Sequence, residues 1–90
     1  MTWDYAKIPP RTLESLRAWI DSARPLGDFC RAVISNDLRT AIARADENNL
    51  EALPAIVKWM VYEAEPFSWG CKEALEWWPE KLKQGERHGK

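Results

Sequence analysis

SNDLRTAIARADENN, residues 35–49, places a short apolar repeat between two clusters of polar side chains. The repeat consists of Leu38, Ala41, Ile42 and Ala45. Its spacing of i, i+3, i+4 and i+7 is typical of a helix with one apolar side, and Asn36 or Asp37 in front of it is a good N-cap. We therefore expect a helix here whose core-facing side carries Leu38 and Ile42.

The same periodicity predicts helices before and after this one. The first of them follows Pro9-Pro10 and has Thr12 as its cap. The second begins at Asp28, the next after residues 35–49 begins between Asn49 and Leu53, and the last begins near Ser68. The apolar side expected for the helix after Asn49 comprises Leu50, Leu53, Val57, Met60, Val61 and Ala64. Pro79 would clash with the Leu75 carbonyl, so the last helix is expected to end or bend sharply near Trp78.

No stretch alternates between apolar and polar residues with a period of two, which is the pattern of a half-buried strand. The predicted fold class is therefore all-α: a compact bundle of about five short helices without a sheet. Residues 10–78 are expected to form a single helical domain. An N-terminal arm at 1–9 precedes it, and a charged, flexible tail at 79–90 follows it.

The composition fits one folded domain and excludes several classes of function. The 90 residues are 46% hydrophobic and 30% charged, with a net charge of −1. Bases exceed acids in residues 1–45 and acids exceed bases in residues 46–78, but neither excess suits strong non-specific DNA binding. No apolar run is long enough to span a membrane, and the N-terminus lacks the apolar segment of a signal peptide. The sequence thus predicts a cytoplasmic protein that does not bind a membrane.

The residues that catalysis requires are poorly represented. His88 is the only histidine and lies in the charged tail, so a Cys–His or Ser–His–Asp arrangement is not expected. The chain has no glycine-rich phosphate loop and no metal ligands at a known spacing. Asp46, Glu47 and Glu51 are more typical of helix caps than of a calcium loop. We therefore expect no enzymatic activity, no metal and no cofactor.

Six tryptophans are a large number for a chain of this size, and burial in the core is one interpretation of them. Trp77 and Trp78 are adjacent, so their side chains point about 100° apart on a helix and cannot both face one core. Trp59 flanks the apolar side of its helix. Aromatic rings beside arginines are typical of protein interfaces. Trp59, Trp77 and Trp78 are therefore candidate binding residues, and stacking on a nucleotide is an alternative.

The second polar cluster, Asp46-Glu47-Asn48-Asn49, is longer than a helix start requires. It lies where the arginine-rich half of the chain meets the acidic half. Arg39, Arg44, Asp46 and Asn49 are therefore candidates for a polar binding site. The alternative interpretation is a simple joint between two helices.

Three stretches form a pattern through most of the chain: IPPRTLESL at 8–16, PLGDFCRAVISNDLRTAIARADENNLEALPAIV at 25–57, and EAEPFSWGCKEALEWW at 63–78. This pattern resembles a group of small, largely uncharacterised proteins encoded by tailed bacteriophages and prophages. The resemblance implies a phage origin and a setting in the host cytoplasm, and it carries over no catalytic residues. The Trp77-Trp78 pair and the basic tail depart from the pattern.

These observations favour a function by binding. The first hypothesis is a small phage accessory protein that binds and inhibits a component of a host antiphage-defence system, such as CRISPR. Its partner would be a host protein, with self-association into a homo-oligomer as a further option. The alternatives are a sponge for a nucleotide immune signal and a minor structural or nucleic-acid-associated phage factor, neither of which is favoured.

Overall fold

The computed structural model describes residues 5–88, with the side chains of residues 5–84. Its elements are η1 (Tyr5–Lys7), α1 (Pro10–Ser22), α2 (Asp28–Ile34), α3 (Leu38–Arg44), α4 (Glu47–Glu63), η2 (Pro66–Ser68) and α5 (Ala74–His88). This part of the chain contains five α-helices and no strand, which confirms the predicted all-α fold. Residues 1–4 of the expected arm and residues 89–90 of the expected tail lie outside the described residues.

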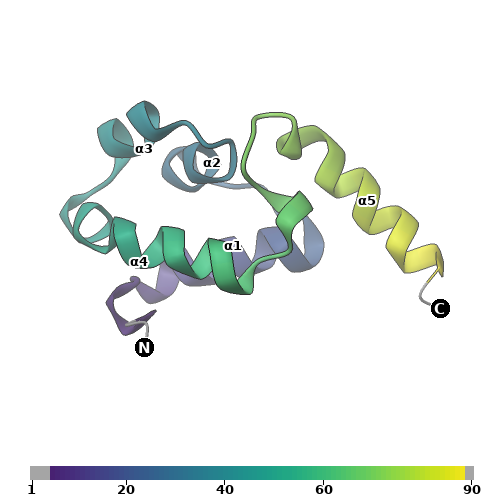
Figure 1. Ribbon diagram of the computed structural model, residues 1–90, viewed down its shortest axis with the longest axis horizontal. Coiled ribbons are helices and arrows are strands. Elements are labelled where there is room, and N and C mark those ends of the chain that lie inside the picture. The colour runs from purple at the N-terminus through teal and green to yellow at the C-terminus, as the bar shows by residue number, and fades with distance from the viewer. Residues whose placement is uncertain (1–4, 89–90) are drawn as a thin grey trace.

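The helices form a flattened molecule of 40 × 29 × 20 Å. In Figure 1, α1 and α4 cross the lower part of the view, α2 and α3 lie above them, and α5 extends away toward the C-terminus. The Thr12 hydroxyl of α1 donates a hydrogen bond to Asn49 Oδ1 of α4 at 2.6 Å. Thr12 is thus a buried residue inside α1 and not the expected cap, because the helix already begins at Pro10. Within residues 5–88, no helix combines the length and apolarity needed to cross a bilayer.

The core lies between α1, α2, α4 and the start of α5. Its fully buried large apolar side chains are Leu16, Ile34, Ile56 and Met60. Trp19, Trp59 and Trp78 extend this core, and none of the three is more than 6% exposed. Each ring removes roughly 200 Å² of mostly apolar surface from water, so these tryptophans stabilise the fold strongly.

Two buried indole groups join α1 to the C-terminal part of the chain. Trp19 Nε1 donates a hydrogen bond to the Ser68 carbonyl of η2 at 2.8 Å. Trp78 Nε1 of α5 donates to the carbonyls of Trp19 and Ile20, each at 3.1 Å. Because a buried N–H without an acceptor is costly, these bonds fix where η2 and α5 lie against α1.

Asn36 and Asp37 have separate roles in the turn between α2 and α3. Asn36 has a φ of 61°, a left-handed conformation that asparagine tolerates better than most residues, and its N–H donates to the Val33 carbonyl at 3.1 Å. The Asp37 N–H donates to the Ala32 carbonyl at 2.8 Å, which completes the closure of α2. The Asp37 carboxylate accepts the Thr40 N–H at 3.2 Å and caps α3, as expected. Hydrogen bonding to Thr40 holds the pKa of Asp37 below its ordinary value.

The helix α4 begins earlier than expected. Asp46 is its N-cap and accepts the Asn49 N–H at 2.8 Å, so Glu47 already belongs to the helix. The polar cluster therefore forms the first turn of α4 and does not interrupt the chain between two helices. Pro54 lies inside the helix, where it offers no N–H to the Leu50 carbonyl.

The helix α5 starts later than expected and extends further than expected at its C-terminal end. It continues to His88, so an end near Trp78, one of the two outcomes predicted from Pro79, is wrong. Pro79 is part of the helix and removes one hydrogen bond, to the Leu75 carbonyl, without ending it. Ser68 lies in η2 and does not cap α5.

The helix α4 buries a different side from the predicted one. Its buried residues are Ala52, Ile56, Trp59 and Met60. Residues two apart on a helix point about 200° apart, so the inward Trp59 turns Val57 and Val61 outward. These two valines are 38% and 55% exposed, and Leu50 is 44% exposed. The expected burial of Leu50, Val57 and Val61 is therefore wrong.

The helix α3 also turns its largest apolar side chains outward. Ala41 is its only buried residue, and its small side chain allows α3 to pack closely on α2. Leu38 is 65% exposed and Ile42 is 45% exposed. The prediction that both are core residues is wrong, because α3 faces α2 with the Ala41 edge of its apolar side and turns the Leu38 and Ile42 edge to solvent.

We expect Trp78→Ala to lower the free energy of unfolding by about 3 to 5 kcal/mol, because it leaves a cavity and removes the indole N–H that two backbone carbonyls accept. The matched control is Trp77→Ala, which removes a neighbouring ring that is 44% exposed. Its effect should be clearly smaller in the same denaturant titration. Equal losses for the two variants would contradict the described core.

Candidate functional site

The apolar side chains that α3 and α4 turn away from the core form a surface that we call the outer apolar surface. It consists of Leu38, Ile42, Leu50, Val57 and Val61. A depression bordered by α2, α3 and α4 contains two of these side chains, Leu38 and Val57. Residues from α3 and α4 and Trp69 take part in its lining: Leu38, Ala41, Leu53, Val57 and Trp69.

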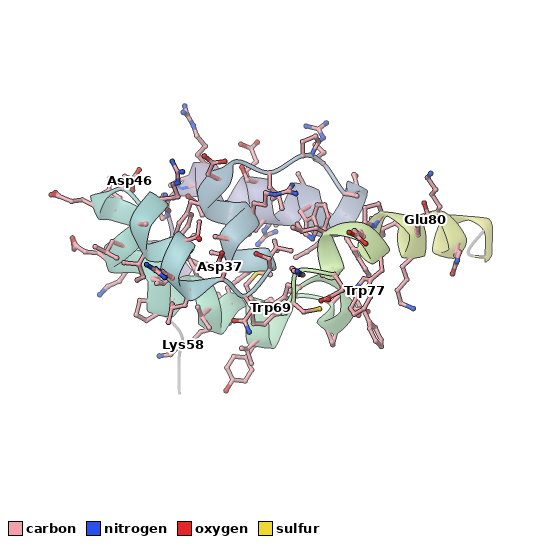
Figure 2. The ribbon with its side chains drawn as sticks, turned by 90° about the horizontal axis from the view of Figure 1, so that it is seen from above. Asp37, Asp46, Lys58, Trp69, Trp77 and Glu80 are labelled. Carbon is pink, nitrogen blue, oxygen red and sulfur yellow. The ribbon has the colours of Figure 1, made fainter. Side chains whose placement is uncertain are left out.

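Trp69 reaches this depression from the segment before α5. The neighbouring Gly70 donates its N–H to the Ile34 carbonyl at the end of α2, at 2.8 Å. Its φ of 107° strongly favours glycine at this position. Figure 2 shows Trp69 near the middle of the molecule. The depression therefore combines side chains from three separate parts of the chain.

A continuous apolar surface of this kind differs from the scattered apolar residues that every protein exposes. Single exposed leucines or valines need no explanation, but contiguous apolar patches on small proteins often mark interaction sites. Here α3 and α4, two consecutive helices, contribute to the same surface. The arrangement can therefore bind an apolar surface of another molecule.

The structure brings two of the four polar candidates together. Asp46 accepts a hydrogen bond from the Asn49 backbone, and the Asn49 side chain accepts one from α1, so both have structural roles. Arg44 Nη1 lies 3.9 Å from Asp28 Oδ2, and both side chains are more than 60% exposed. Such an exposed pair adds little stability. Arg39 is exposed on α3, and a binding role for the four residues stays a prediction.

The three tryptophan candidates occupy different environments. Trp59 and Trp78 are buried in the core, so the free molecule offers little of either ring to a partner. Trp77 is half-exposed, and its Nε1 donates to the Phe67 carbonyl at 2.8 Å. Figure 2 places Trp77 and Asp46 toward opposite ends of the molecule. The predicted binding residues therefore do not form a single site.

The titratable side chains of the described residues show no arrangement that points to a reaction. No three His, Cys, Asp or Glu side chains among these residues gather closely enough to hold a metal ion. Cys30 and Cys71 are free, and burial raises the pKa of the Cys30 thiol to about 11. That thiol is therefore protonated near neutral pH and is a poor nucleophile.

Comparisons with known proteins do not assign this chain to a family. No protein-family model matches the chain, and no curated protein or solved structure is significantly similar to it. A functional proposal must therefore start from the side chains themselves.

The sequence contains the signal for the outer apolar surface, although its periodicity predicts core residues there. The apolar repeats that carry Leu38, Ile42, Val57 and Val61 are real, and both lie on helices. Periodicity reports that one side of a helix is apolar. It does not report whether that side meets the protein's own core or a partner.

We expect Leu38→Asp and Ile42→Asp to change the free energy of unfolding by no more than about 1 kcal/mol, because both sites are open to water. Ala41→Asp is the matched variant on the same helix, and it should cost about 3 kcal/mol or more because it buries an unpaired charge. Denaturant titrations of dilute protein measure all three. Unfolding of the Leu38 or Ile42 variant would show that α3 packs by its other side.

Proposed function

We propose that this protein acts by binding another protein and that the outer apolar surface is its contact site. One observation carries the proposal: α3 and α4 both leave branched apolar side chains exposed outside the core. Leu38 and Val61 are both more than half exposed. Leaving these side chains in water is unfavourable, and a partner would remove them from it.

The size of this surface indicates the kind of binding it supports. Full burial of a leucine, isoleucine or valine is worth about 1.5 to 3 kcal/mol, so covering five half-exposed side chains contributes roughly 5 kcal/mol. Loss of translational and rotational freedom on association costs about 4 kcal/mol or more. The apolar contact alone is therefore weak, and a suitable partner must add complementary polar groups around it.

The partner we propose is a host protein that belongs to an antiphage-defence system, either CRISPR or another, and that is inhibited when bound. The support for this role is the resemblance of residues 8–78 to small proteins of tailed phages, which also implies the host cytoplasm as the setting. Inhibition by binding requires a contact surface and no catalytic residues. The nucleotide-sponge and nucleic-acid hypotheses stay predictions from the sequence alone.

The test is phage plating on hosts that carry a defence system and express this protein. We expect the wild-type protein to restore plating on at least one defended host and Ile42→Asp to fail, because the new charge opposes burial of α3. Gln84→Glu is the control, since it adds the same charge on the exposed face of α5. It should act like the wild-type protein.

Two outcomes would contradict the proposal. One is wild-type protein that restores plating on no defended host. The other is that the Ile42→Asp variant restores plating as well as the wild type does. That result would show that inhibition does not use the outer apolar surface. Thermal melting of the purified protein checks that each variant is folded, so loss of folding is not mistaken for loss of binding.

A further inference from the structure

A pocket with aromatic walls lies where η2 meets the outer side of α5. Its lining includes Phe67 of η2 together with Trp77, Glu80 and Lys81 of α5, and its volume is about 340 Å³. The three α5 residues are spaced i, i+3 and i+4, which places them on one side of the helix. Phe67 is 56% exposed and Trp77 is 44% exposed, so two aromatic rings are open to a ligand. Figure 2 places Trp77 and Glu80 toward the C-terminal end of the molecule.

Phe67 holds two of the groups that line this pocket. Its carbonyl accepts the Trp77 Nε1–H at 2.8 Å, which fixes the indole beside η2. Its ring lies under the Lys81 ammonium, with Nζ 4.7 Å from the ring centre, in a cation–π contact. An ammonium group has three N–H donors, so one that lies over a ring can still donate to an anion. The pocket therefore combines an exposed indole and an ordered positive charge before any ligand arrives, which lowers the entropy cost of binding.

The charges of the pocket favour an anionic ligand over a cationic one. Glu80 Oε2 lies 3.8 Å from Lys83 Nζ, three residues further along α5. One acid and the two bases Lys81 and Lys83 give this side of the helix a net charge of +1. A cationic ligand would have to displace Lys81 from the Phe67 ring and compete with Lys83 for Glu80. The quaternary ammonium compounds that aromatic cages bind therefore do not suit this pocket.

We propose that this pocket binds a nucleotide, with its base stacked on Trp77 and its phosphate beside Lys81. An aromatic side chain can stack on any base, because every base has a π face. The Lys81 ammonium supplies the positive charge that a phosphate attracts. Glu80 can accept an amino N–H of adenine, guanine or cytosine, which uracil and thymine do not offer.

This inference concerns a second site and goes beyond the proposed function, because none of the pocket residues belongs to the outer apolar surface. A volume of about 340 Å³ is at the lower end of the range for small-ligand sites, so the pocket admits one nucleotide. The same base and phosphate occur in a free nucleotide and at the end of a single strand. The experiment therefore compares these two sources.

The test is an NMR titration with adenosine 5′-monophosphate (AMP), followed at the Trp77 indole N–H and the backbone amides of Phe67 and Lys81. We expect these signals to shift with a dissociation constant on the order of 1 mM, because one open ring and one ammonium bind weakly. Adenosine, which lacks the phosphate, should bind about threefold more weakly than AMP. Cytidine monophosphate should bind about threefold more tightly than uridine monophosphate, which has no amino N–H for Glu80.

Three variants separate the roles of the side chains. Trp77→Leu should weaken AMP binding at least about fivefold, because it removes the ring on which the base stacks. Lys81→Gln should weaken AMP binding about threefold and leave adenosine binding unchanged. Phe67→Leu should have the same selective effect on AMP, because it removes the ring that holds Lys81 and keeps the carbonyl that holds Trp77. Lys7→Gln is the control, since it makes the same charge change at an exposed position of η1 and should bind AMP as the wild type does.

A short 5′-phosphorylated oligoadenylate is the second ligand, and it distinguishes the two sources of a nucleotide. Equal affinity for the strand and for AMP would assign the pocket to a free nucleotide. Tighter binding of the strand would assign the pocket to the end of a single strand. Both results support a nucleotide site.

Three outcomes would overturn the proposal. The first is no shift at about 10 mM AMP, tenfold above the expected dissociation constant. The second is tighter binding of tetramethylammonium than of AMP, which would make the pocket a cation site. The third is equal binding of AMP by Lys81→Gln and the wild type, which would exclude the phosphate contact. Thermal melting shows that each variant is folded, and none of these outcomes depends on the plating test.

Discussion

The hydrogen bond from the Trp19 indole to the Ser68 carbonyl connects the two halves of the chain inside the core. Its length is 2.8 Å, and both residues are at most 4% exposed. A buried polar group that loses its partner costs about 1 to 3 kcal/mol, so α1 and η2 separate only at considerable cost. Trp78 reinforces the connection by donating to the Trp19 and Ile20 carbonyls. The positions of η2 and α5 follow from these bonds.

The same tryptophan-rich core determines what the molecule offers to a partner. Trp59 of α4 is buried, and the guanidinium of Arg17 lies 5.7 Å from the centre of its ring. Once this ring faces inward, the geometry of the helix turns Val57 and Val61 toward solvent. Because α3 packs on α2 through Ala41, its larger residues Leu38 and Ile42 also face solvent. Burial of Ala41 and Trp59 thus leaves the other apolar side chains of α3 and α4 exposed, and these form the outer apolar surface.

The sequence predicts the helices well and the sides that they bury less well. The all-α class, the five helices and the Asp37 cap follow from local patterns, which act within a few residues. The rotation of α4 depends on the competition between Trp59 and the smaller valines for the core, which only tertiary packing decides. The extension of α5 past Pro79 shows that one missing hydrogen bond need not end a helix. For the site, the repeats are visible in the sequence, but periodicity does not tell which side of each helix meets the core.

The central claim is that the outer apolar surface of α3 and α4 is exposed to solvent when the chain is alone. Methyl NMR of dilute protein with a soluble paramagnetic agent tests it most directly, because line broadening reports how closely the agent approaches each methyl group. We expect strong broadening at Leu38 and Val61 and little at Ile56 and Met60, which are 0% exposed. The reverse pattern, with Leu38 and Val61 protected in the monomer, would contradict the account.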